Sequence, residues 1–263
     1  MNNPADTIIA VRNLKIGYGE KIILQNINFE VRRGEVFMIL GGSGSGKSTL
    51  LKNLIGLYTP DDGEVWIEDG NMVTARDDER RLLFRKFGVM YQGGALFGSM
   101  TVLENVLLPL DEFTDLPEPV KELVALAKLK QVGLGTAALK MPSELSGSMQ
   151  KRAAIARAMA LDPRILFLDE PSAGLDPVTS AGLDLLIKEL ARQCGITFVI
   201  VTHELASIYG IADRIIMLDC QTRTIIAEGQ PAVLREQADD PWVRRFFNRE
   251  PDPIEPAPPR LIP

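Results

Sequence analysis

A glycine-rich run that ends in a lysine and a serine constrains the fold of this 263-residue chain more than any other feature. It follows the apolar stretch Val36–Leu40, typical of a buried strand, and precedes a helical pattern that reaches about Gly56. The spacing fits GxxxxGK[ST], in which glycines let successive backbone N–H groups point at phosphate oxygens beside a helix N-terminus. We expect Lys47 to reach the β- and γ-phosphates of a nucleotide and Ser48 to ligate Mg²⁺. The predicted nucleotide-binding residues of this loop are Gly41, Gly42, Ser43, Gly44, Ser45, Gly46, Lys47, Ser48 and Thr49.

A glycine-rich turn with a chance lysine is the alternative interpretation of this loop. Its position between a strand and a helix disfavours that alternative.

Strand and helix patterns alternate around this loop. Short apolar runs bounded by turn residues occur at Ile8–Val11, Ile22–Leu24, Ile27–Val31, Ile165–Leu168 and Ile196–Val201. From about residue 93 to residue 161 the strand signal fades, and Val120, Leu123, Val124 and Ala127 fall at helical spacing. The pattern predicts an α/β core with a mostly parallel sheet and an inserted helical subdomain.

Composition disfavours several classes of protein. The net charge of −6, from 29 basic and 35 acidic residues, argues against nucleic acid as a partner. Neither cysteine lies near the only histidine, His203, so we expect no disulfide framework, no zinc site and a reducing cytosol. The apolar runs fall far short of the roughly 18 residues of a membrane span, and Met1–Asp6 lacks the apolar stretch of a signal peptide. If the protein acts at a membrane, we expect another chain to supply the spans.

Two acids follow a later apolar strand. Ile165–Leu168 runs directly into Asp169 and Glu170. Ligands of open α/β sheets bind at the carboxyl ends of the strands, which is where the phosphate loop also lies. We expect Asp169 to hold Mg²⁺, directly or through water, and Glu170 to polarise the attacking water. An exposed acidic turn after a strand is the alternative for both residues.

The order of these motifs resembles the ATP-binding subunits of ABC transporters, over about Ile8 to Gly229. The most specific match is the run Leu145, Ser146, Gly147, Ser148 and Met149, which resembles the family signature LSGGQ and opens a helix-forming segment. A helix N-terminus binds phosphate oxygens well. The resemblance implies that Ser146 and the Gly147 backbone bind the γ-phosphate of an ATP held by a second copy.

The chain departs from the family pattern at three positions. Ser148 replaces the second glycine of the signature, and Met149 replaces its glutamine. If position 148 needs a positive φ, serine there costs about 1 kcal/mol of strain, which bears on how well ATP closes the pair. Gly42 stands where proline is common, and we expect it to be harmless but more flexible.

Four further family motifs fall at matching positions. Gln92 follows the strand Gly88–Tyr91 and resembles the glutamine that contacts Mg²⁺ and the attacking water. His203 resembles the switch histidine that contacts the γ-phosphate, against the alternative of a structural histidine after a strand. Tyr18 resembles the aromatic residue that stacks on adenine, against a tyrosine packed on the sheet. A fourth match is to the family's D-loop, which crosses to the partner subunit. The residues that resemble it are Ser172, Ala173, Gly174, Leu175 and Asp176.

The resemblance completes the fold class: a P-loop NTPase core with a mostly parallel sheet, an N-terminal antiparallel β subdomain and an inserted α-helical subdomain. We expect residues 7–229 to form the ATP-binding domain, with the helical subdomain at about 93–161, and residues 230–263 to form a C-terminal extension. ATP and Mg²⁺ are the implied cofactors. Two copies would face head to tail, each ATP lying between the phosphate loop of one and the signature of the other.

Within the family, residues 92–106, Met149 and the run Asp240–Phe247 resemble the Mla/Mce type of lipid transport ATPase. This implies a homodimer at the cytoplasmic face of the bacterial inner membrane, integral membrane permease subunits and a periplasmic or membrane-anchored lipid-binding protein. We expect the segment after Gln92 to contact a short permease helix, the alternative for Leu96 and Phe97 being packing within the helical subdomain.

Another ABC importer or exporter, or an ABC ATPase without a transport role, is the alternative function. The coiled-coil insertion of repair types and the fused second ATPase unit of translation types are not seen, and a small-molecule kinase would leave the signature unexplained.

The C-terminal residues form two parts. Trp242, Val243, Phe246 and Phe247 gather apolar bulk on a short predicted helix, which needs a surface to cover it. Packing on its own core and bridging to the partner copy are the two possibilities. Six prolines from Pro251 to Pro263 predict an extended or disordered tail.

Replacing Lys47 tests the phosphate loop. We expect Lys47→Ala to weaken nucleotide binding, because the ammonium contact with the β- and γ-phosphates is lost. Calorimetric titration with ATP measures the change, and an undiminished affinity would contradict the assignment.

Overall fold

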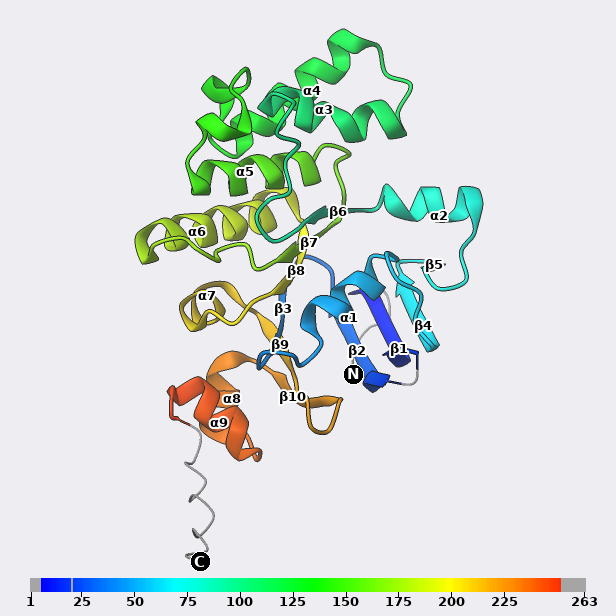
Figure 1. Cartoon of the computed structure of the whole chain (residues 1–263), viewed down its shortest axis with the longest axis vertical. Coiled ribbons are helices and arrows are strands. Elements are labelled where there is room, and N and C mark those ends of the chain that lie inside the picture. The colour runs from blue at the N-terminus through cyan, green and yellow to red at the C-terminus, as the bar shows by residue number, and fades with distance from the viewer. Residues whose placement is uncertain (1–5, 20, 252–263) are drawn as a thin grey trace, which may run out of the picture.

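Two β-sheets organise the molecule. A computed structural model describes residues 6–19 and 21–251, and Figure 1 shows their arrangement. The smaller sheet is antiparallel, in the order β2-β1-β4-β5. Its strands are β1 (Thr7–Tyr18), β2 (Lys21–Arg32), β4 (Asp62–Ile67) and β5 (Gly70–Asn71).

The larger sheet has the order β10-β9-β3-β8-β7-β6. Its five strands from β9 to β6 are parallel, and only β10 runs antiparallel to its neighbour. The strands are β3 (Val36–Gly41), β6 (Phe87–Met90), β7 (Ile165–Asp169), β8 (Thr197–Val201), β9 (Arg214–Leu218) and β10 (Ile225–Gly229). This topology confirms the predicted fold class.

Nine α-helices lie in the described ranges, and Figure 1 shows α3, α4 and α5 gathered at one end of the molecule. The helices are α1 (Lys47–Leu54), α2 (Asp77–Phe84), α3 (Val102–Phe113), α4 (Glu118–Gln131), α5 (Gly147–Ala158), α6 (Pro177–Cys194), α7 (Leu205–Ile211), α8 (Pro231–Gln237) and α9 (Pro241–Asn248), with 3₁₀ turns η2 (Gly135–Ala137) and η3 (Pro142–Glu144). Because α3 to α5 lie between β6 and β7 in the chain, they form the inserted helical group that the sequence predicted. The predicted boundaries of the domains stay a prediction. No described helix combines the length and apolarity needed to cross a bilayer.

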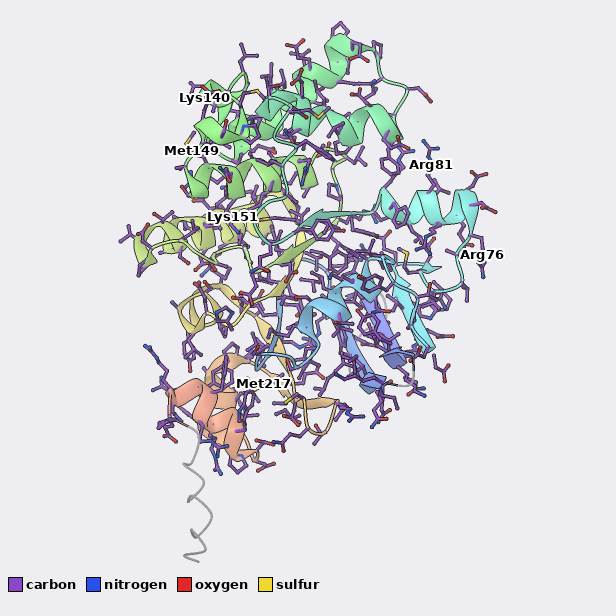
Figure 2. All side chains as sticks on the ribbon, in the orientation of Figure 1. Arg76, Arg81, Lys140, Met149, Lys151 and Met217 are labelled. Atoms are coloured by element: carbon purple, nitrogen blue, oxygen red, sulfur yellow. The ribbon has the colours of Figure 1, made fainter. Side chains whose placement is uncertain are left out.

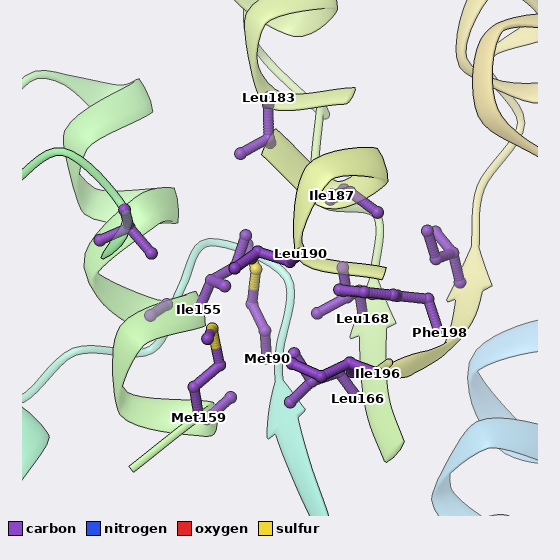
Figure 3. Packing of buried hydrophobic residues seen from close by; sticks show 14 of the residues in the cluster. Met90, Ile155, Met159, Leu166, Leu168, Leu183, Ile187, Leu190, Ile196 and Phe198 are labelled. Atoms are coloured by element: carbon purple, nitrogen blue, oxygen red, sulfur yellow. The ribbon is translucent and has the colours of Figure 1, made fainter. Parts of the chain in front are cut away.

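The parallel sheet buries both of its faces. Along β3, Met38 and Leu40 belong to one hydrophobic cluster while Phe37 and Ile39 belong to another. Successive side chains of a strand point to opposite faces, so two separate layers must cover the sheet. One cluster joins the sheet to the helices α3 to α9, and Figure 3 shows part of it around Leu166 and Leu168. The other joins the sheet to α1 and to the antiparallel sheet.

Helix α4 confirms the helix that the spacing predicted, but the apolar residues at that spacing do not form its buried side. Val120 is 40% exposed and Leu123 is 67% exposed, whereas Ala125 and Leu129 are fully buried. The reason is tertiary: α4 contacts both α3 and α5, and the residues between these neighbours are the buried ones. Spacing alone does not tell which side of a helix meets a neighbour.

The C-terminal apolar residues pack on the chain's own core. Val243 and Phe247 are buried in the cluster that contains α5 and α6, with Trp242 and Phe246 packed against it. The Tyr209 hydroxyl on α7 also donates a hydrogen bond of 3.3 Å to the Phe247 carbonyl. This confirms that helix α9 covers its apolar bulk within one chain. The expected proline-rich tail lies, beyond Pro251, outside the described residues.

Replacing Gly88 tests how the helical group is seated on the sheet. A Cβ at Gly88 would lie 1.9 Å from the Ala158 carbonyl oxygen at the end of α5, so Gly88→Ala must push α5 away from β6. We expect a loss of about 1–3 kcal/mol of unfolding free energy, as for other overpacked sites, measured by urea denaturation. Gly98→Ala is the matched control, because a Cβ at Gly98 meets nothing within 4 Å. Equal stabilities of the two variants would contradict the close approach.

Candidate active site

The phosphate loop joins β3 to α1 in a backbone shape that favours glycine. Gly41, Gly44 and Gly46 have φ values of 151°, 76° and 93°, in the region that side chains disfavour. The Lys47 ammonium donates hydrogen bonds of 2.9 and 3.0 Å to the carbonyls of Gly41 and Gly42. Burial lowers the pKa of Lys47, and the negative charges of Glu170 and Asp169 partly oppose this shift. The Lys47 side chain is therefore hydrogen-bonded to the backbone of the predicted loop itself.

Three neighbouring parallel strands bring polar side chains to this loop. Asp169 is the last residue of β7, and its carboxylate accepts a 3.2 Å hydrogen bond from the Ser48 hydroxyl at the start of α1. His203 follows β8, and its Nδ1 lies 2.8 Å from Glu170 Oε1. The strand order β3-β8-β7 makes these contacts possible. Because the strands are parallel, residues that are far apart in sequence lie together at the carboxyl edge of the sheet.

Asp169 and Glu170 are both buried, at 7% and 9% exposure. Burial raises the pKa of Asp169, the neighbouring charge of Glu170 adds to the rise, and the hydrogen bond from Ser48 opposes it. Glu170 adopts φ 48°, and its backbone N–H donates to the Val201 carbonyl at 2.9 Å. Within the described residues, its Oε2 is buried without a hydrogen-bond partner. One oxygen of Glu170 thus lies beside His203, and the other is buried without a partner among the described residues.

These residues fit a magnesium nucleotide. In the described ranges, no group of three or more His, Cys, Asp or Glu side chains is placed to hold a metal ion. Mg²⁺ is usually bound through one or two protein oxygens together with phosphates and water, and Ser48 and Asp169 supply such a pair. The unpartnered Oε2 of Glu170 fits a hydrogen bond from a water beside the terminal phosphate.

Gln92 lies at the same edge but makes no contact of this kind. It follows β6, the strand beside β7, and its side chain is exposed. Among the hydrogen bonds of residues 6–19 and 21–251, none joins Gln92 to Ser48 or Asp169. Its predicted part in binding Mg²⁺ stays a prediction.

The signature residues begin helix α5. Ser146 is the N-cap, and its hydroxyl accepts a 3.3 Å hydrogen bond from the Met149 N–H. Ser148 lies inside the helix and has no positive φ, so the strain considered for serine at this position does not arise. The Ser148 hydroxyl lies 3.3 Å from that of Ser146 instead. Ser146 and Gly147 are exposed, as an anion-binding helix end would have to be.

The signature and the phosphate loop do not meet within one chain. Figure 2 shows Met149, in the first turn of α5, well separated from α1. The D-loop lies beside the signature: a Cβ at Gly147 would be 3.8 Å from the Leu175 side chain. Asp176 is the N-cap of α6 and accepts hydrogen bonds of 3.1 Å from the N–H groups of Val178 and Thr179. A nucleotide on the loop of one chain is therefore not touched by that chain's own signature.

Tyr18 ends β1 and is 52% exposed. Its ring meets the Tyr58 ring edge-on, with centroids 6.0 Å apart. Because this contact leaves much of the ring open, Tyr18 is free to stack on a planar base, and it does not pack flat on the sheet.

Sequence reasoning missed Lys151. It lies on α5 at 6% exposure; burial lowers its pKa, while the charges of Glu170 and Asp169 oppose the shift. Lys151 therefore belongs to the electrostatic surroundings of these carboxylates. A lysine in a helix-forming run is normally solvated, and only the packing of α5 on the sheet distinguishes this one.

Replacing Glu170 tests its role. We expect Glu170→Gln to bind ATP but to lose at least about a hundredfold in turnover, because an amide cannot accept a proton from water. Steady-state phosphate release measures the rate, and Glu189→Gln, an exposed change on α6, is the control. Unchanged hydrolysis by Glu170→Gln would remove the residue from its role.

Comparison with known proteins places the chain. A family model described as ABC transporter matches residues 24–173. The intermembrane phospholipid transport system ATP-binding protein MlaF of Escherichia coli K12 is 40% identical over 94% of this chain and 91% of its own. The probable ribonucleotide transport ATP-binding protein mkl of Mycobacterium leprae is 39% identical over 93% of this chain and 70% of its own. The dimeric structure of MJ0796, a bacterial ABC transporter cassette, is 36% identical with a TM-score of 0.76, covering 84% of this chain and 98% of that one. The chain belongs to the ABC transporter family and is one of its ATP-binding, ATP-hydrolysing subunits.

Proposed function

We propose that this chain hydrolyses ATP to drive the movement of phospholipid, or another hydrophobic substrate, across the bacterial envelope. The similarity to MlaF over 94% of the chain supports this substrate class. The similarity to mkl makes a ribonucleotide the second candidate. The observation that carries the hydrolytic part is the hydrogen-bonded set Ser48–Asp169 and His203–Glu170 beside the phosphate loop.

The residues of that set and Lys47 would divide the work of hydrolysis. Ser48 and Asp169 would hold Mg²⁺, which supplies positive charge to the phosphates when bound. Glu170 would accept a hydrogen bond from the attacking water at its unpartnered Oε2 and take up the proton. His203 fixes the other oxygen of Glu170 at 2.8 Å and, being 62% exposed, can also face the terminal phosphate. Lys47 would leave the carbonyls of its loop for the β- and γ-phosphates.

The active unit would be a homodimer. Because the signature is distant from the loop of its own chain (Figure 2), a second copy has to supply Ser146 and Gly147 to the bound nucleotide. The dimeric structure of MJ0796 supports such a pair. ATP would close the dimer by being touched from both sides, and loss of the γ-phosphate would release it.

A groove beside the segment that follows Gln92 suits the membrane partner. It has a volume of about 690 Å³ and is mostly apolar, with Asp111 and Glu112 among the residues that line it. The lining residues are Val89, Tyr91, Ala95, Phe97, Leu108, Pro109, Asp111, Glu112, Phe113 and Arg157. Phe97 is 56% exposed, whereas Leu96 packs on the core. A short apolar helix of a permease carrying a basic residue would fit here, on the cytoplasmic face of the inner membrane.

The groove is also firmly built. The Arg157 guanidinium donates hydrogen bonds of 2.9 Å to the carbonyls of Gly94 and Ala95. The buried side chain of Asn105 accepts from the Phe97 N–H at 2.8 Å and donates to the Phe97 carbonyl at 3.1 Å. A rigid seat next to the end of β6 could pass a movement at the nucleotide to the permease, and a periplasmic or membrane-anchored lipid-binding protein would complete the system.

Purification from native membranes tests the function. We expect the tagged chain to be recovered with a multi-span membrane protein, and the ATPase rate of that complex to rise with phospholipid but not with ribonucleotide. Phe97→Arg should keep the ATPase activity of the isolated chain and lose the membrane protein, because a charge enters the apolar groove. Recovery with ribosomes or DNA would contradict transport, and stimulation by ribonucleotide alone would favour the second candidate.

A further inference from the structure

The C-terminal helix α9 reaches the phosphate loop. The nearest atoms to a Cβ built on Gly42 are Trp242 Cζ2 at 3.5 Å and Cη2 at 4.0 Å. Both atoms belong to the six-membered ring of the indole, so the far end of the side chain faces Gly42 across a space that one Cβ would fill. Figure 1 shows α8 and α9 together on the side of the molecule that holds β3, β9 and β10.

Several contacts fix the indole in this position. The Asp240 carboxylate caps α9 and accepts hydrogen bonds of 2.7 and 3.3 Å from the N–H groups of Trp242 and Val243. The Phe246 ring lies 5.7 Å from the indole, centroid to centroid. Val243 is fully buried in the core beneath. The helix therefore presents Trp242 to the loop as part of a rigid surface.

The loop needs such a surface. Four of the six residues from 41 to 46 are glycines, so the loop loses much backbone freedom when it is ordered around phosphates. The Gly42 carbonyl accepts hydrogen bonds from Lys47 Nζ at 3.0 Å and from the Ser45 N–H at 3.3 Å. Gly42 is thus held by the loop's own donors, and the indole bounds the space on the side where a Cβ of this residue would lie.

We propose that Trp242 is a positioning residue for the phosphate loop, which makes nucleotide affinity depend on the C-terminal helix. The inference rests on the proposed nucleotide-binding role of residues 41–49. Trp242 touches no reacting group: it restrains the backbone at Gly42, so that less freedom is lost when phosphates bind. Since the same restraint acts before and after the chemical step, it should change KM more than kcat.

Trp242→Phe separates this contact from the packing of α9. A phenyl ring can still pack on Phe246 but is too short to reach Gly42. We expect the Kd for ATP and the KM to rise roughly three- to tenfold, the size of one lost packing contact, with kcat and the unfolding midpoint nearly unchanged. Trp66→Phe is the matched control, because Trp66 lies in the antiparallel sheet, hydrogen-bonded to Glu64. An unchanged Kd in Trp242→Phe would overturn the proposal.

Fluorescence provides a test that leaves the contact intact. The chain has two tryptophans, so Trp66→Phe leaves Trp242 as the sole tryptophan, which can be excited selectively over the tyrosines. We expect ATP or ADP to change its emission with the same Kd that calorimetry gives, and no such change in Trp242→Phe. Emission that stays constant through saturation would overturn the proposal. If Lys47→Ala retained full affinity, the nucleotide role of the loop would fail; if only the Trp242 tests failed, that role would stand.

Discussion

The hydrogen bond from Ser48 to Asp169 is the interaction on which the rest of the site depends. It joins the first turn of α1 to the end of β7, two elements that only the strand order brings together. Because β8 lies between β3 and β7, the residues that follow β8 are placed beside both. His203 therefore reaches Glu170 without any special loop. A parallel sheet concentrates such side chains at its carboxyl edge, where the helix N-terminus of α1 also favours anions.

The two layers that cover the sheet carry different parts of the candidate site. The layer of α1 and the antiparallel sheet supports the nucleotide loop and carries Tyr18. The layer of α3 to α9 carries the signature, the groove and the C-terminal helix in one continuous hydrophobic cluster. Such a cluster transmits displacement well, because a closely packed interior deforms little. The phosphate loop lies where these two layers meet, and Trp242 of the second layer faces Gly42.

Short sequence patterns predicted the features that neighbouring residues determine. The strand, loop and helix around Lys47 and the acids after Ile165–Leu168 could be read from spacing, and they lie where expected. Family resemblance gave the fold class and the positions of Ser146 and His203. The contacts that sequence could not give are those between distant segments. The approach of Trp242 to Gly42 and the burial of Lys151 follow from how helices pack on the sheet, and neither leaves a periodic signal. For the same reason the spacing in α4 identified a helix but not its buried side.

The backbone of Glu170 has a consequence for how this protein can adapt to heat. A left-handed conformation costs a residue with a side chain about 1 kcal/mol, and a buried carboxylate oxygen without a partner adds to that cost. Glycine or asparagine at this position would relieve the backbone strain and remove the charge, but it would also remove the carboxylate to which we assign the proton transfer. Substitutions that stabilise this protein and keep the Glu170 carboxylate must therefore lie elsewhere in the chain.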